Sequence, residues 1–291
     1  MNDLTKKQTV IKRFALDFSS GPLIMGIVNV TPDSFSDGGK FLDNEKAVEH
    51  ALRLEDEGAD ILDIGGESSR PFAEAVSEEE EIRRVIPLIY ELSKRVSAPI
   101  SIDTIKSKVA KLAVEAGASI INDISAMTID PEMLSTAASS NAAVILMHMK
   151  GEPRTMQIDP FYDDVVSEIM AYLKTMMDSA EKVGIEKSSI ILDPGIGFGK
   201  DISHNLAIIN AIPDFKTLGA PVLIGPSRKS FIQKILGTDL KTGIERVEAG
   251  TLAVVTSSLM NGADIVRVHD VKAAKAALEI IKALKGSKCR P

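Results

Sequence analysis

The stretch EGADILDIGG, residues 57–66, contains the unit from which the rest of the chain is built. Gly58 lies where a helix would end, because glycine most readily takes the left-handed conformation of a helix C-cap. A short apolar run with the length of one β-strand follows at once, Asp60–Ile64. The same junction recurs as NGAD at 261–264 and, in related form, as EAGAS at 115–119. These repeats predict a helix, a glycine and then a strand.

Outward from this unit, apolar runs of strand length alternate with amphipathic stretches of helical length, which is typical of a parallel sheet. The strand-length runs are Leu23–Val28, Asp60–Ile64, Pro99–Ile102, Ser119–Ile121, Ala142–Met147, Ser189–Leu192, Pro221–Ile224 and Asp264–Val268. The helical patterns include Glu45–Glu57, Glu78–Val96, Lys106–Ala116 and Asp163–Val183.

Eight strand–helix pairs of about 36 residues each match the size of a (β/α)8 barrel. We therefore expect an α/β fold with a single (β/α)8 TIM barrel over residues 23–291. Residues 1–22 form a short N-terminal extension, in which Val10–Phe18 is predicted to be a strand pair that closes the barrel floor. A doubly wound open sheet is the alternative, because periodicity alone does not show that a sheet closes.

Composition excludes several classes of protein. The 291 residues hold 34 Lys and Arg against 41 Asp and Glu, a formal charge of −7, so we expect no binding of nucleic acid or anionic membranes. No apolar run approaches the ~18 residues of a membrane span, and the N-terminus has no signal-peptide pattern. The single cysteine, Cys289, allows no intramolecular disulfide. These features predict a soluble, cytoplasmic protein.

Polar side chains follow every predicted strand, at the end where barrel enzymes carry their chemistry. In chain order they are Asn29, Glu67, Arg70, Asp103, Asn122, Asp123, His148, Asp193, Arg228, Lys229, Arg267 and His269. Any one of them could simply cap a helix or satisfy loop backbone. Eight strand ends converging on one rim favour a polar site instead, since burying so many polar groups without partners would be unfavourable.

Two kinds of side chain on this rim suggest two parts of a ligand. The cationic set suits an anionic group such as a phosphate, although rim cations could instead pair with rim carboxylates. That set is Arg70, Lys229, Arg267 and His269. Asp103, Asn122 and Asp193 suit a flat ring rich in N–H donors. Two carboxylates could equally act as a general acid and base, and the spacing does not decide between these uses.

Two segments, 29–39 and 68–75, have no helical or strand period and are rich in turn-forming residues. Loops of this length over a barrel mouth are typical of mobile lids, with ordinary surface loops as the alternative. The glycine-rich segment Gly195–Lys200 lacks the spacing of a nucleotide-binding loop. The four histidines have no metal-ligand spacing, which argues against a zinc site.

Several of these segments together resemble the dihydropteroate synthase family of pterin-binding enzymes, over residues 23 to 270. The two long signatures are Gly26–Gly39, GIVNVTPDSFSDGG, and Asp63–Pro71, DIGGESSRP. The shorter matches, in family order, are Ile102–Thr104, Ile121–Asp123, Met147–Met149, Asp193–Lys200, Ser227–Ser230 and Arg267–His269.

The resemblance implies a barrel that joins 4-aminobenzoate to (7,8-dihydropterin-6-yl)methyl diphosphate, giving 7,8-dihydropteroate and diphosphate. It implies that the pterin is held by Asp103, Asn122, Asp193 and Lys229, and Met147 is a further substrate-binding candidate. It also places Mg²⁺ on the diphosphate beside Asn29, and the diphosphate itself on Arg267 and His269. The aminobenzoate site would be formed by Phe35, Ser69, Arg70, Pro71 and Ser230. A homodimer, and inhibition by sulfonamides that mimic aminobenzoate, are implied in the same way.

The mechanism that we expect is electrostatic. Asp103 and Asp193 would stabilise positive charge on the pterin as diphosphate leaves, with Lys229 and Arg70 as further catalytic candidates. One residue departs from the family pattern: Ser69 stands where threonine is usual, a loss of one methyl worth roughly 1 kcal/mol of packing at most. The fit of aminobenzoate analogues is therefore open, and the Ser69→Thr variant tests it.

Three rival functions remain at this point. A methyltetrahydrofolate-dependent methyltransferase would share Asp103, Asn122 and Asp193 but would need neither the 29–39 loop nor the cationic pair Arg267 and His269. A non-catalytic pterin-binding protein and a barrel with unrelated phosphate chemistry are the others.

Overall fold

The computed structural model describes residues 8–11, 14–30, 40–68, 75–151, 156 and 158–286. Eight parallel strands form its centre: β3 (Leu23–Asn29), β4 (Ile61–Gly65), β5 (Ile100–Asp103), β6 (Ile120–Asp123), β7 (Ala143–Met147), β8 (Ile190–Asp193), β9 (Leu223–Ile224) and β10 (Ile265–Val268). Neighbours pair in the order β8-β7-β6-β5-β4-β3-β10-β9. A parallel bridge between Leu192 and Val222 joins the two ends of this order. The predicted barrel is confirmed, and the open sheet is excluded.

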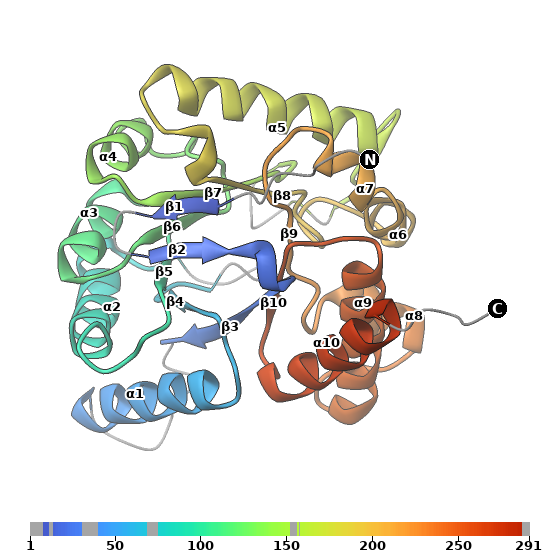
Figure 1. Cartoon of the computed structure of the whole chain (residues 1–291), viewed down its shortest axis with the longest axis horizontal. Helices are drawn as coiled ribbons and strands as arrows, with labels where there is room; N and C mark the ends of the chain where they lie inside the picture. Colours follow the sequence, from blue (N-terminus) through green and yellow to red (C-terminus); the bar gives the residue numbers. More distant parts are fainter. Residues whose placement is uncertain are drawn as a thin grey trace.

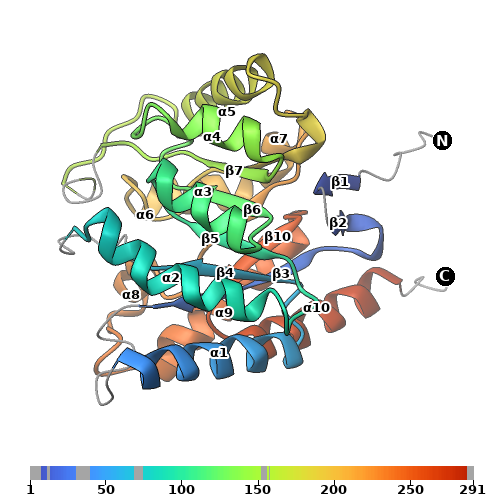
Figure 2. The same ribbon diagram turned by 90° about the vertical axis from the view of Figure 1, so that its left-hand side faces the viewer.

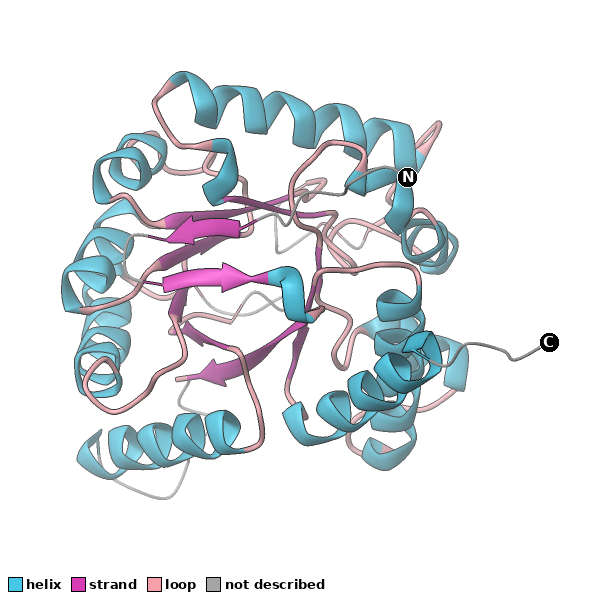
Figure 3. Cartoon of the chain, viewed as in Figure 1, coloured by secondary structure: helices cyan, strands magenta, loops and turns pink. Residues whose placement is uncertain are grey.

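Helices surround the strands on all sides (Figures 1 and 3). They are α1 (Lys40–Asp56), α2 (Glu78–Leu92), α3 (Ser107–Ala116), α4 (Met133–Ser140), α5 (Val165–Lys182), α6 (Ile202–Asn210), α7 (Ile212–Lys216), α8 (Ser230–Leu236), α9 (Ile244–Met260) and α10 (Val271–Gly286). Short 3-10 helices lie at Phe18–Ser20 and Lys187–Ser189. Within the described part of the chain, no helix is long and apolar enough to cross a membrane.

The observed elements follow the predicted pattern with small shifts at their ends. The predicted strand Pro221–Ile224 shortens to the two residues of β9. Pro221 has no N–H to give to a ladder, and the N–H of Val222 donates instead to Asp264 Oδ2, at 2.9 Å. The junction glycine Gly58 takes a φ of +99°, as expected after a helix.

An antiparallel hairpin, β1 (Gln8–Ile11) and β2 (Phe14–Asp17), lies across the amino-terminal ends of the barrel strands (Figures 1 and 2). Leu16 from β2 is buried in an apolar cluster with residues that point into the barrel, among them Met25, Ile61 and Ile265. This floor cluster packs the barrel interior at the amino-terminal ends of the strands, and it leaves the carboxyl-terminal ends to carry polar groups.

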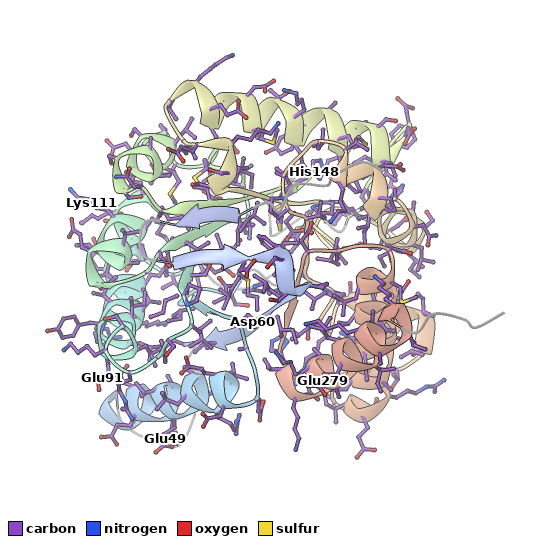
Figure 4. All side chains as sticks on the ribbon, in the orientation of Figure 1. Glu49, Asp60, Glu91, Lys111, His148 and Glu279 are labelled. Atoms are coloured by element: carbon purple, nitrogen blue, oxygen red, sulfur yellow. The ribbon has the colours of Figure 1, made fainter. Side chains whose placement is uncertain are left out.

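The charged helix residues Glu49, Glu91, Lys111 and Glu279 lie at the periphery, whereas His148 lies inside the ring of helices (Figure 4). The main apolar cluster occupies the layer between helices and strands, with Leu54 on α1 and Leu88 on α2 as typical members. The helix layer therefore buries apolar surface and supports the strands, and it leaves the strand ends to carry polar groups.

Candidate active site

Strand alternation explains why polar side chains gather at one end of the barrel. On β4, Ile61 points into the floor cluster, so Asp63 two residues later points into the barrel as well. The same step of two leads from Ile120 to Asn122 and from Ile191 to Asp193. Backbone register then sets these ends side by side, because Asp103 pairs with Gly65 on one side and with Asn122 on the other.

An ion-pair network lies at the bottom of this polar layer. Arg267 Nε donates to Asp63 Oδ2 at 2.6 Å, and its Nη2 donates to Asp103 Oδ2 at 2.7 Å. Asn122 Nδ2 donates to Asp63 Oδ2 at 3.2 Å. Asp63 is fully buried, and its charge is therefore balanced by Arg267 rather than by water. The alternative in which a rim cation pairs with carboxylates thus holds for Arg267, although these two bonds use only two of its five N–H donors.

One pocket brings most of the candidate residues together. It is lined by Asp103, Asn122, Ile124, Met147, Asp193, Ile196, Phe198, Gly225, Lys229 and Arg267. The apolar members Ile124, Met147 and Phe198 pack into a cluster of their own. The pocket therefore combines carboxylate and amide oxygens with apolar side chains, one of which is the aromatic ring of Phe198, and this combination suits a planar ligand with N–H donors.

The loop after β8 forms the wall of this pocket and depends on its glycines. Gly195 has a φ of +72°, and its N–H donates to Asp193 Oδ1 at 2.7 Å. A Cβ atom on Gly195 would lie 1.9 Å from the carbonyl oxygen of His148. A Cβ atom on Gly197 would lie 2.9 Å from Lys229 Cδ. These glycines allow the loop to approach both β7 and Lys229, whose Nζ lies 3.9 Å from the centre of the Phe198 ring.

Burial dominates the electrostatics of the two pocket carboxyls. Burial raises the pKa of Asp103 to about 7, against the opposing charge of Arg267. Burial likewise raises the pKa of Asp193 to about 6, against its hydrogen bond from Gly195 and the charges of Lys229 and Lys200. Shifts of this kind in a pocket are typical of functional carboxyls.

His269 follows β10, and its ring is oriented by Ser227 from the loop after β9. Ser227 Oγ lies 2.9 Å from His269 Nδ1 and accepts the backbone N–H of the same histidine at 3.3 Å. Asn29, at the end of β3, is half-buried at the same rim. A Cβ atom on Gly65 would lie 3.8 Å from Asn29 Oδ1 and 3.6 Å from Asp103 Cβ, so these three residues are neighbours.

Other residues of the predicted rim do not line this pocket. They form ion pairs or satisfy loop backbone instead. Arg228 forms an ion pair with Glu248 of α9, and Asp123 Oδ1 accepts the N–H and the hydroxyl of Ser125. Glu67 accepts the N–H of Val76. Ser230 begins α8 and is exposed. Four further candidates lie outside the described residues, namely Phe35, Ser69, Arg70 and Pro71.

Sequence reasoning missed three residues of this region, Asp63, Phe198 and Lys200. Asp63 had a usable signal, because a charged residue in the middle of a buried strand must have a partner. Lys200 was set aside together with its glycine-rich segment, yet it is one of the most buried large side chains described. No sequence pattern pairs it with its actual neighbours, which are His148, directly after β7, and Phe198 in the loop after β8.

The described residues contain no group of three or more His, Cys, Asp or Glu side chains placed to hold a metal ion. A metal held at the rim by these described residues alone would take most of its ligands from substrate and water. Mg²⁺ is commonly bound in that way, with few protein oxygens and several from phosphate and water. Asn29 is half-buried, and its side chain carries an amide oxygen that fits such a partial ligand set.

Comparison with known proteins gives a consistent match. The family model for pterin-binding enzymes matches residues 25–269. Dihydropteroate synthase of Bacillus subtilis is 49% identical over 261 residues, covering 90% of this chain and 88% of that protein. The synthase of Synechocystis is 46% identical over 268 residues, covering 92% of each.

Solved structures agree with the sequence relatives. Xanthomonas albilineans dihydropteroate synthase with 4-aminobenzoic acid superposes with a TM-score of 0.90 at 44% identity, covering 98% of this chain and all of that one. The same enzyme with 7,8-dihydropteroate gives 0.85 at 43% identity, with 95% and 98% covered. The Yersinia pestis synthase with a sulfonamide drug complex gives 0.89 at 40% identity, with 96% and 100% covered.

Proposed function

This chain belongs to the dihydropteroate synthases of the pterin-binding enzyme family, and from that premise we propose which side chains hold each substrate and promote the reaction. The enzyme is a transferase of folate biosynthesis that condenses 4-aminobenzoate with (7,8-dihydropterin-6-yl)methyl diphosphate. Its products are 7,8-dihydropteroate and diphosphate. Membership in this family also makes it a sulfonamide target.

The pocket lined by Asp103, Asn122 and Asp193 is the pterin site. The observation that carries this assignment is the convergence of two carboxylates and one amide, from the ends of β5, β6 and β8, into one pocket with an apolar wall. A pterin has ring N–H and amino donors along one edge and flat faces, so the oxygens bind the edge while Met147 and Phe198 contact the ring. Lys229 lies beside Phe198 and can reach an acceptor on the same ring.

The reaction breaks the C–O bond between the pterin methylene and the diphosphate, and the aryl amine nitrogen forms the new C–N bond and then loses a proton. As diphosphate leaves, positive charge develops on the methylene and spreads into the electron-rich ring. In their ionised forms, Asp103 and Asp193 are held in place by hydrogen bonds and stabilise that charge. The aryl amine is already neutral near pH 7, so no strong base is required.

His269 and Arg267 bind the departing diphosphate at the rim. Arg267 uses the N–H donors that do not bind Asp63 or Asp103. Mg²⁺ held by Asn29 would supply charge neutralisation to the diphosphate. The 4-aminobenzoate site is formed by Phe35, Ser69, Arg70, Pro71 and Ser230, with Arg70 as the partner for an anionic group.

One assay tests the activity, and a second assay tests the requirement for a metal ion. Diphosphate release should require both substrates, and release that ignores 4-aminobenzoate would contradict a synthase. Removing divalent cations with EDTA should abolish release, and Mg²⁺ should restore it. Activity that persists without divalent cations would exclude the metal.

We also infer a homodimer and a cytoplasmic location. Large apolar side chains are exposed near the carboxyl-terminal ends of α9 and α10, at Met260, Ile280 and Leu284, and support an interface there. Light scattering should give twice the mass of one chain. A single cysteine in 291 residues suits a reducing compartment, and cell fractionation would test that location.

A further inference from the structure

Lys200 is a buried cation just behind the pterin pocket, with an exposed fraction of 2%. Its Nζ lies 3.0 Å from His148 Nδ1, and it donates to the carbonyl oxygens of Phe198, at 2.9 Å, and His148, at 3.3 Å. Burial lowers the pKa of His148 to about 3, so its ring is neutral and Nδ1 can accept. The three ammonium hydrogens thus meet three uncharged acceptors.

These acceptors connect Lys200 to Asp193. The backbone N–H of His148 donates to the carbonyl oxygen of Asp193 at 2.9 Å, and the N–H of Gly195 donates to its Oδ1 at 2.7 Å. A Cβ atom on Gly195 would lie 3.3 Å from Lys200 Nζ, so the ammonium group lies against the turn that holds the Asp193 carboxylate. Phe198, whose carbonyl Lys200 binds, lines the same pocket.

A buried charge whose only hydrogen-bond partners are uncharged is unfavourable for stability, because desolvation opposes it and an apolar side chain of similar size would pack at lower cost. Its charge therefore has a use beyond packing. We propose that Lys200 is a positioning residue for the pterin site, whose charge keeps Asp193 ionised and whose hydrogen bonds hold the Phe198 loop against β7. This inference rests on the proposed role of Asp193 in binding the pterin.

The charges around both groups support this role. Asp193 faces Lys229, Lys200 and Arg267, and all three lower its pKa against burial. Lys200 in turn faces Asp193, Lys229 and Lys150, and burial lowers its pKa to about 7. Lys200 is therefore still charged near pH 6, where Asp193 titrates, and removing it takes away one of the three cations that keep Asp193 ionised.

The test compares Lys200→Gln and Lys200→Met with the wild-type enzyme, using kcat/KM for the pterin diphosphate between pH 6 and 8. If the pKa of Asp193 rises by about one unit, the ratio of variant to wild type should fall about fivefold from pH 8 to pH 6. KM for 4-aminobenzoate should stay unchanged. Lys150→Met is the matched control, since Lys150 is exposed and solvent screens its charge.

A ratio that stays constant with pH would show only lost packing and would overturn the proposal. If neither variant folds, the wild-type protein still decides the question: the ¹³C shift of the Asp193 carboxyl, which titrates near pH 6, should show a second step near pH 7 as Lys200 loses its charge. The absence of that second step would overturn the coupling. Separately, Asp193→Asn that binds pterin as wild type does would refute the pterin site itself, whatever Lys200 does.

Discussion

At the scale of single residues, the site depends on carboxylates that are buried and yet held ready by specific partners. The Arg267 guanidinium donates one hydrogen bond to Asp103 and another to Asp63. Such an arrangement fixes the position of a charge before substrate arrives, and this preorganisation is the largest electrostatic source of rate in many enzymes. The role of Asp103 can therefore be tested by removing charge while keeping shape.

We expect Asp103→Asn to lower kcat for diphosphate release by on the order of 10²-fold, because the amide cannot stabilise positive charge on the pterin. The variant keeps an oxygen that can accept from Arg267, so the fold should survive. Steady-state assays with both substrates give kcat, and thermal unfolding provides the control. A rate near that of wild type would remove Asp103 from the mechanism.

Sequence reasoning located the polar residues that line the pocket but not their pairing. Strand alternation and the rule for barrel ends were enough to place Asp103, Asn122 and Asp193 together. The partner of Arg267 lies 204 positions away in the chain, on β4, and no local pattern encodes such a contact. The burial of Lys200 is set by how a glycine loop folds back on β7, which depends on positive φ angles rather than on hydrophobic period.

At the scale of elements, the connections between strands and helices carry buried charges of their own. Lys106, which precedes α3, donates to Glu67 after β4 and to Glu81 of α2. The Glu81 side chain is 1% exposed, and that of Lys106 is 21% exposed. This cluster fastens three elements together, and the charge of Glu81 is tolerated there only while Lys106 is present.

Lys106→Met should lower the free energy of unfolding by about 3–5 kcal/mol, because it leaves the Glu81 carboxylate buried without a cation. Urea denaturation measures the change. Lys108→Met is a matched control two residues away, since Lys108 is exposed and pairs with Glu78, and we expect a change within about 0.5 kcal/mol. Adding Glu81→Gln should restore most of the loss; no recovery would mean that the lysine acts through packing alone.

A pH effect on stability arises at Asp123, the last residue of β6. Burial raises the pKa of Asp123 to about 6, against about 3.8 for a free carboxyl. The folded state thus binds this proton more tightly than the unfolded state does, so the stabilisation present below pH 3.8 is lost as pH rises toward 6. Between pH 4.5 and 7, wild type should lose about 2 kcal/mol of unfolding free energy relative to Asp123→Asn. A parallel pH dependence of the two proteins would contradict the raised pKa.

At the scale of the whole molecule, the apolar residues that stabilise the barrel interior and the polar residues of the pocket lie at opposite ends of the strands. The alternation of apolar runs with helical patterns predicted this architecture, and the Leu192–Val222 bridge supplied the closure that periodicity could not show. The inward positions near the amino ends of the strands are apolar and meet the β1–β2 hairpin, whereas those at the carboxyl ends are polar and form the pocket. Substitutions at the two ends should therefore affect different properties.

Leu16→Ala tests this division at the floor. Leu16 is 3% exposed and packs on Met25, Ile61 and their neighbours, so truncation leaves a cavity and should lower the free energy of unfolding by about 2–4 kcal/mol. Because the pocket lies at the other end, kcat and both KM values should stay within about twofold at a temperature where the variant is folded. Leu206→Ala on α6 serves as the control, since Leu206 is 42% exposed and its truncation should change stability little. A large loss of kcat in folded Leu16→Ala would show that the floor is coupled to the site.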